Sequence, residues 1–142
     1  MGSEAAGRVA LLSIHPLYAE AILDGRKLVE FRRSRLAPDI AIVVVYATKP
    51  VGRVVGWFEV EEIVEGTPMS LWRRFASCAG IDRRSYLQYF DRAALAFGIK
   101  VRKSVRLVEP ALLCDLRPTL RPPQSFQYLP TSVVAEAIGL AT

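Results

Sequence analysis

The sequence predicts an α+β fold, in which a small, curved mixed β-sheet or barrel has helices covering its ends. Short apolar runs of strand length are separated by turn residues, and helical segments are inserted early and in the middle of the chain. The 142 residues, of which 51% are hydrophobic, are enough to bury one core. We therefore expect a flexible lead-in over residues 1–8 and a single domain over residues 9–142.

The first third of the chain predicts a strand, a helix and a second strand. Residues 9–14 form an apolar run of strand length. Pro16 begins the helix, because proline lacks the N–H that the first helical position leaves unpaired, and Gly25 ends it. Residues 27–33 then alternate apolar and charged side chains, as a strand does.

The middle of the chain predicts two strands and two helices. Residues 40–47 are nearly all apolar and rich in β-branched side chains, which predicts a central strand buried on both faces. Residues 54–64 read as a long strand, in which Gly56 indicates a bulge or a bend. A helix is expected over residues 67–79, and Asp82 begins another short one.

The last third returns to strand and then becomes rich in proline. Residues 94–108 predict a strand, and residues 111–116 predict a last strand near an edge of the sheet. Residues 117–128 contain too much proline for a helix or a central strand, so we expect them to run extended across the surface. Residues 133–140 predict a short terminal helix.

Basic residues outnumber acidic ones. The formal charge of +5 and the isoelectric point near 9.6 favour an anionic partner such as nucleic acid. The strand over residues 94–108 would present a basic stripe opposite its core face, although sheets also carry basic faces that are merely solvated. This basic stripe consists of Lys100, Arg102 and Arg106.

Cysteine and histidine are too few for a metal site or a disulfide framework. Cys78 and Cys114 lie far apart without a CxxC pair, and we expect both to be buried free thiols. No segment approaches the roughly 20 apolar residues that cross a bilayer, and the first residues lack the apolar stretch of a secretory signal. We therefore expect a cytoplasmic protein without a membrane partner.

Two charged residues alternate with two apolar ones in the second predicted strand. Val29 and Phe31 would share one face, and Glu30 and Arg32 the other. An acid and a guanidinium at this spacing can pair or jointly frame a ligand; they can equally form a solvated ion pair on a surface strand. Bases with aromatic rings nearby suit single-stranded nucleic acid, whereas Phe31 on the face of Val29 is equally typical of a core residue.

Several familiar catalytic patterns are missing. His15 is the only histidine that a Ser-His-Asp triad could use, and no serine lies in a G-x-S-x-G elbow. A histidine at a helix entrance fits a capping residue or a ligand contact better. Glu59 and Glu61 share a face of the long strand but have no histidine or aspartate beside them for a metal site. The sequence contains no P-loop, GxGxxG or EF-hand pattern.

Three short motifs occur in order along the chain: Ser13-Ile14-His15-Pro16, Gly25-x-Lys27-x-x-Glu30-x-Arg32 and Pro122-Pro123-Gln124-Ser125-Phe126. Together they resemble the ASCH domain, a relative of the PUA RNA-binding domain, and the resemblance runs from about residue 9 to residue 128. The resemblance implies a PUA-like mixed β-barrel with a cleft between the first helix and the barrel, lined by Lys27, Glu30 and Arg32.

The resemblance also implies an activity related to RNA. The family is associated with nucleic-acid binding, often in regulators of transcription or translation, and one branch is reported to cleave single-stranded RNA. Another branch resembles amidohydrolases that remove the acetyl group of N4-acetylcytidine with a lysine, a threonine nucleophile and a glutamate. Lys27 matches that lysine, but Glu30 stands where the threonine would be, and a carboxylate cannot replace the attacking hydroxyl. His15 also departs from the pattern, because lysine is expected there more often.

These observations predict a protein that binds nucleic acid through the cleft, with single-stranded RNA favoured over DNA, in a regulatory role and without a cofactor. Two alternatives stay open: a hydrolase acting on RNA or on a modified nucleoside with Lys27 and Glu30, and a site for a nucleotide-sized ligand. Whether the protein is an enzyme is left undecided. The candidate binding residues are Ser13, His15, Arg26, Lys27, Glu30, Arg32, Arg33, Lys49, Lys100, Arg102, Gln124 and Ser125.

Overall fold

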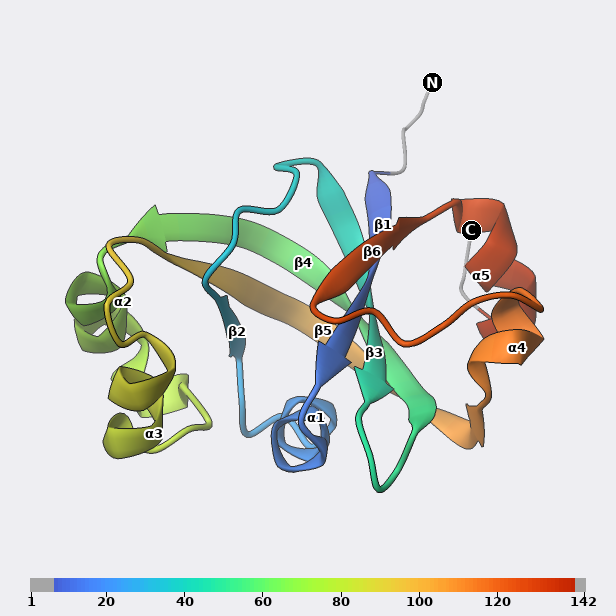
Figure 1. Ribbon diagram of the computed structural model, residues 1–142, viewed down its shortest axis with the longest axis horizontal. Helices are drawn as coiled ribbons and strands as arrows, with labels where there is room; N and C mark the ends of the chain where they lie inside the picture. The colour runs from blue at the N-terminus through green and yellow to red at the C-terminus, as the bar shows by residue number, and fades with distance from the viewer. Residues whose placement is uncertain (1–6, 140–142) are drawn as a thin grey trace.

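The computed structural model describes residues 7–139, which form one six-stranded mixed sheet with helices around it (Figure 1). The strand order is β2-β5-β4-β3-β1-β6. The strands are β1 (Arg8–Ile14), β2 (Val29–Arg32), β3 (Ile40–Ala47), β4 (Arg53–Gly66), β5 (Ala96–Ala111) and β6 (Phe126–Leu129). The helices are α1 (Pro16–Leu23), α2 (Pro68–Phe75), α3 (Arg83–Tyr89), α4 (Leu113–Leu116) and α5 (Thr131–Ile138), and a 3₁₀ turn, Ala76–Cys78, follows α2.

The predicted α+β class is confirmed, and so are the central elements. β3 lies between β1, with which it pairs in parallel, and β4, with which it pairs antiparallel, so its apolar residues are covered on both faces. The register of β4 shifts between Val54 and Gly56, where a bulge was expected. Gly25 has a φ of 81°, which suits a glycine that ends a helix.

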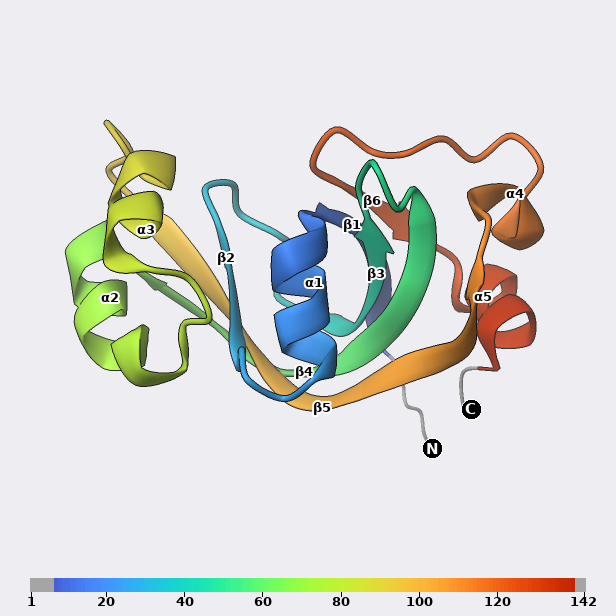
Figure 2. The ribbon, with the colours of Figure 1, turned by 90° about the horizontal axis from the view of Figure 1, so that it is seen from below.

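The word barrel describes the sheet only loosely, because the sheet is open. β2 pairs with β5 alone and β6 with β1 alone, so both are edge strands among residues 7–139. Figure 2 shows how the long strands β4 and β5 curve beneath α1, which lies in the concave side of the sheet. The strong curvature brings the two edges toward each other without backbone pairing between them.

Two sequence predictions near the C-terminal end are wrong. Residues 111–116 do not form an edge strand, because β5 continues to Ala111 and the next residues turn into α4. Leu113 and Leu116 of α4 are buried against the core while Cys114 points outward, so Cys114 is exposed and only Cys78 is partly covered. The proline-rich segment does run extended, and its end forms the edge strand β6.

The helices α2 and α3 form a unit of their own at one end of the sheet, while α4 and α5 lie at the other end (Figures 1 and 2). We call residues 67–95 the α2–α3 module. Its core is aromatic: Phe75, Tyr86 and Phe90 surround Phe31 of β2, with ring centroids 4.8–6.4 Å from that of Phe31. This packing confirms Phe31 as a core residue and fixes the module against the edge strand β2. Among residues 7–139, no helix is long and apolar enough to cross a membrane.

Candidate functional site

A cavity of about 420 Å³ lies between α1 and α3, with β2 contributing residues between them. The α2–α3 module therefore provides the wall opposite α1. The lining residues come from four parts of the chain: the end of β1, α1 with its N-cap, residues 27–32, and α3 with the turn before it. They are Ser13, Ile14, His15, Tyr18, Lys27, Glu30, Phe31, Arg32, Ile81, Ser85, Tyr86, Gln88 and Tyr89.

Glu30 and Arg32 form a buried ion pair in this cavity. Arg32 Nη1 lies 3.0 Å from Glu30 Oε2, and the two side chains are only 10% and 9% exposed. The alternative of a solvated pair on a surface strand is therefore wrong, because the face of β2 that carries both residues is covered by α1, the α2–α3 module and the segment before β6. The second carboxylate oxygen of Glu30 has no donor among the described residues.

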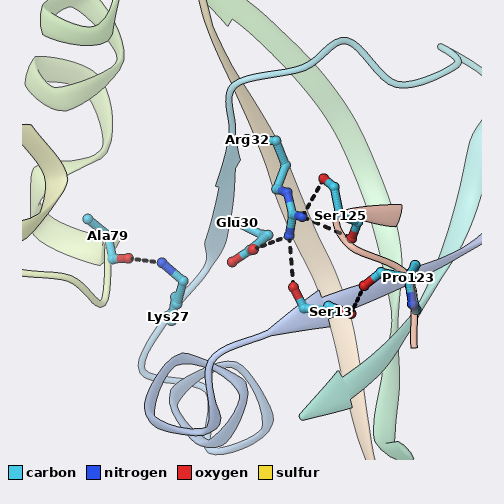
Figure 3. A network of polar contacts seen from close by, with 7 residues as sticks. All are labelled: Ser13, Lys27, Glu30, Arg32, Ala79, Pro123 and Ser125. Atoms are coloured by element: carbon cyan, nitrogen blue, oxygen red, sulfur yellow. Dashed lines mark hydrogen bonds and ion pairs between the residues drawn. The ribbon is translucent and has the colours of Figure 1, made fainter. Parts of the chain in front are cut away.

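Arg32 is occupied by the protein itself (Figure 3). Its Nη1 also donates to the carbonyl of Ser13 at 3.3 Å, and its Nη2 donates to the carbonyl and the hydroxyl of Ser125 at 3.0 and 2.9 Å. Ser13 Oγ donates to the carbonyl of Pro123 at 2.6 Å. Since Ser125 directly precedes β6, the Arg32 side chain bridges the two open edges of the sheet.

Lys27 is the most deeply buried charged residue of the cavity, with 2% of its surface exposed. Its Nζ donates to the carbonyl of Ala79 at 2.6 Å and lies 5.3 and 5.1 Å from the ring centres of Tyr18 and Phe31. Burial lowers the pKa of Lys27 below its ordinary value, and the nearby Glu30 carboxylate opposes that shift in part. A lysine in this state is closer to losing its proton than a surface lysine.

Two turns place Lys27. After Gly25, the backbone N–H groups of Arg26 and Lys27 both donate to the carbonyl of Ala21, at 2.9 and 3.0 Å, which directs the chain from α1 into β2. On the other side, Gly80 has a φ of 63°, and a Cβ there would lie 2.4 Å from Cβ of Lys27. The absence of a side chain at Gly80 therefore lets the Ala79–Gly80 turn lie directly on the Lys27 stem.

The wall formed by α3 was not predicted from the sequence. Ser85, Gln88 and Tyr89 look like ordinary positions of a short helix, and nothing in their spacing links them to Lys27. Tyr86 is fully buried and donates to the carbonyl of Pro68 at 2.7 Å, and burial raises its pKa to about 12. An unusual density of tyrosine and phenylalanine over residues 86–90 is the one sequence signal that could have indicated this wall.

The structure brings only part of the predicted site together. Five predicted residues line the cavity: Ser13, His15, Lys27, Glu30 and Arg32. Ser125 reaches it through Arg32. Lys100 is bound to Glu61 and Glu62 at 3.0 and 3.2 Å, and Arg26 is bound to Asp24 at 3.0 Å. Lys100 and Arg26 do not line the cavity. The remaining predicted residues do not line it either: Arg33, Lys49, Arg102 and Gln124.

His15 acts as the N-cap of α1. Its Nδ1 accepts a hydrogen bond from the backbone N–H of Leu17 at 3.1 Å, so this nitrogen carries no proton in the observed arrangement. The imidazole is exposed at the rim of the cavity, with its ring centre 5.5 Å from that of Tyr18. The predicted helix-entry role of His15 is thus confirmed, and its position at the rim leaves the ligand contact as a prediction.

The groups that line the cavity suit recognition of a planar polar ligand. The described residues contain no group of three histidine, cysteine, aspartate or glutamate side chains that could hold a metal ion. The cavity instead offers a buried carboxylate oxygen, a buried ammonium group and several aromatic rings.

Comparisons with known proteins agree with this architecture. A family model described as the ASCH domain matches residues 12–105. Over 136 residues the chain is 33% identical to a Zymomonas mobilis protein called an ASCH domain-containing ribonuclease, covering 94% of this chain and 92% of that protein. The crystal structure of ASCH from Zymomonas mobilis has a TM-score of 0.85 and 31% identity, covering 94% of this chain and 96% of that one. The N-terminal domain of Staphylothermus marinus McrB, with a TM-score of 0.57 and 11% identity over 92% of each chain, shares the fold alone. On these matches, this chain belongs to the ASCH domain family.

Proposed function

We propose that this protein binds single-stranded RNA and that the cavity between α1 and α3 receives one unstacked nucleotide. The observation that carries the proposal is the presence of two buried groups in one cavity. Among residues 7–139, one carboxylate oxygen of Glu30 has no donor and the ammonium of Lys27 has a single acceptor. Buried polar groups require partners, so a ligand that pairs with both is favoured.

The edge of a nucleobase provides these partners. Glu30 can accept a hydrogen bond from an exocyclic amine such as that of cytosine, and Lys27 can donate to a neighbouring ring nitrogen or carbonyl. Tyr18 and Tyr89 line the cavity beside them and offer aromatic surface for the flat faces of a base. The volume of about 420 Å³ lies within the range of small-ligand sites.

Two arguments favour single-stranded RNA. A base in a duplex is stacked and paired, so its edge cannot enter a cavity without first being unstacked. The Zymomonas mobilis relative, which matches almost over its full length, is named a ribonuclease, and this supports RNA over DNA. Arg32 has a positioning role in this proposal, because both of its terminal nitrogens are engaged by Glu30, Ser13 and Ser125.

Binding of short fluorescent single-stranded RNA, single-stranded DNA and duplex DNA would test the proposal. Lys27→Met removes the ammonium but keeps an unbranched stem between Tyr18 and Phe31, and Glu30→Gln removes the charge at nearly constant volume. Lys103→Gln, at an exposed position of β5, is the matched control for loss of one positive charge. We expect salt-sensitive binding of single-stranded RNA that both cavity variants weaken by tenfold or more and that the control retains. Equal binding by all four proteins would contradict the proposed site. Binding of free nucleotides by a protein that does not bind RNA would show that the ligand of the cavity is a nucleotide and not an RNA strand.

RNA cleavage is the second candidate, favoured by the name of the relative and by the state of Lys27. A lysine with a lowered pKa can, in its neutral form, take the proton of a ribose 2′-hydroxyl as that oxygen forms a bond to the adjacent phosphorus. The bond between phosphorus and the 5′-oxygen then breaks and the 5′-oxygen takes up a proton from water, while the Glu30 carboxylate, as the acid–base partner, stabilises the ammonium formed on Lys27. Labelled RNA incubated with the wild type and with Lys27→Met would test this. Cleavage that persists at the wild-type rate in Lys27→Met would exclude Lys27 as the base.

A further inference from the structure

We propose that the α2–α3 module holds the phosphate backbone of the RNA strand whose base enters the cavity. This inference rests on the proposed function and names the surface that the strand follows on either side of the bound nucleotide. It assigns a role to arginines that lie outside the sequence motifs and outside the cavity lining.

The module carries a large share of the net positive charge of the chain. Residues 67–95 contain five arginines against two aspartates, a net charge of +3 out of +5 for the whole chain. By contrast, residues 7–66 contain eight basic and eight acidic residues. The part of the chain from β1 through β4 is thus electrically balanced, whereas the wall opposite α1 is not.

Four of the five arginines have no acidic partner within 4.0 Å among residues 7–139: Arg73, Arg83, Arg84 and Arg92. The fifth, Arg74, reaches Glu62 only at 3.8 Å. The Asp82 carboxylate is engaged in capping α3, where it accepts from the backbone N–H and the hydroxyl of Ser85 at 2.8 and 2.9 Å. All four guanidinium groups belong to exposed residues and are available to an anion.

Two of these arginines are positioned next to the cavity. Arg84 directly precedes Ser85 and lies four residues before Gln88, so it shares a side of α3 with a lining residue. Arg92 follows Tyr89 by three residues, in the turn beyond the C-terminal end of α3. A strand with one base in the cavity can therefore meet one arginine before that nucleotide and another after it.

Arginine is the residue type expected for this task. Its planar guanidinium binds two phosphate oxygens at once, and it loses little hydration in doing so. The pairing of a base cavity with a flanking row of free arginines distinguishes this surface from a general solubilising charge. It also favours a nucleic-acid backbone over an acidic protein as the partner.

The salt dependence of RNA binding tests the inference. The variant Arg84→Gln/Arg92→Gln removes two positive charges from the module. The control Lys103→Gln/Arg117→Gln also removes two positive charges. Lys103 lies in the middle of β5, and Arg117 follows α4, which lies at the end of the sheet opposite the module (Figure 1). For single strands each phosphate contact contributes about 0.7 to the slope of log affinity against log salt concentration. We expect the slope between about 50 and about 200 mM salt to become shallower by about 1.4 in the module variant and to stay unchanged in the control.

The outcomes separate the two proposals. Wild-type protein that binds no single-stranded RNA would overturn the proposed function and this inference together. Wild-type binding with equal slopes in both double variants would overturn the inference alone. Polyglutamate that displaces RNA from the wild type as readily as unlabelled RNA does would identify the module as a surface for acidic protein and would also overturn it. A shallower slope in the module variant alone, with unchanged thermal unfolding, supports it.

Discussion

The basic stripe of β5 and the α2–α3 module differ in how much of their charge is free. In the stripe, Lys100 is bound to Glu61 and Glu62, and Arg106 is bound to Glu20 and Asp24. Of the three stripe cations, only Arg102 has no acidic partner within 4.0 Å among residues 7–139. In the module, four arginines have no acidic partner within the part of the chain that the structure describes.

The difference shows that charge in a sequence is not the same as charge offered to a partner. The alternation of Lys100, Arg102 and Arg106 made the stripe conspicuous, but its acidic partners come from α1 and β4, which are distant in sequence. The module's arginines have no regular spacing, and only the structure shows that they surround a cavity wall. Screening by a carboxylate within about 4 Å decides how much field a cation presents to solvent.

The largest expected effect is on stability, where loss of the buried Glu30–Arg32 ion pair should cost much more than loss of an ion pair in the stripe. Arg32→Met leaves Glu30 buried and unpaired, so the free energy of unfolding should fall by about 3–5 kcal/mol. Arg106→Met breaks contacts made by half-exposed side chains and should cost at most about 1 kcal/mol. Urea unfolding of both variants measures the contrast. The double variant Glu30→Leu/Arg32→Met removes both charges and should recover much of the loss; similar costs for Arg32→Met and Arg106→Met would mean that Glu30 is solvated.

A second experiment tests how closely the module rests on Lys27. Gly80 and Gly25 both have positive φ, but a Cβ at Gly80 would lie 2.4 Å from Cβ of Lys27, whereas nothing lies within 4 Å at Gly25. Gly25→Ala should cost about 1–2 kcal/mol from backbone strain alone. Gly80→Ala should cost about 1–3 kcal/mol more, because the turn must shift away from Lys27. Repeating Gly80→Ala in a Lys27→Gly background, which also lacks the Cβ at position 27, should remove that excess. An excess that persists there would point to a different contact.

Lys27 of the cavity and Lys100 of the stripe should change the free energy of unfolding in opposite directions as the pH rises. Burial lowers the pKa of Lys27, so its folded state loses the proton first as pH rises, and the free energy of unfolding should rise up to the ordinary lysine pKa of about 10.4. Hydrogen bonds to Glu61 and Glu62 raise the pKa of Lys100, so stability should fall once pH exceeds that ordinary value. Urea unfolding across alkaline pH, with Lys27→Met and Lys100→Met as references, measures both. If the free energy of unfolding rises equally in Lys27→Met, another group causes the rise.

The smallest expected effect comes from uncovering the stripe. Glu61→Gln removes one of the two carboxylates bound to Lys100 and leaves Glu62, the partner of Arg74, in place, so the salt slope of RNA binding should steepen by at most about 0.7. Glu109→Gln changes the net charge equally at an exposed position and should leave the slope as it is. A slope that steepens equally in both variants would show that net charge, and not the position of a free cation, governs binding.

The local elements of the fold could be predicted from the sequence because their signals are local. Pro16 and Gly25 bound α1, the β-branched run over residues 40–47 forms β3, and Asp82 caps α3 through its own carboxylate. The motif around Lys27, Glu30 and Arg32 placed these three residues in one cleft, and all three line the cavity. Period-two alternation was enough to assign Phe31 to the core.

The partners of these residues were decided only in three dimensions. Ala79, Ser125 and Tyr89 reach the Lys27–Arg32 segment from positions at least 50 residues further along the chain, and no spacing rule connects them. The sheet stays open because its edge strands β2 and β6 do not pair with each other through their backbones. The Arg32 side chain connects the two edges, through Ser125 next to β6. Residues 111–116 became the end of β5 and a helix because Leu113 and Leu116 find the same core that α5 covers. Hydrophobic periodicity fixes which face of an element is buried, but burial, ion pairing and pKa depend on what that face meets, and only the packed chain determines that.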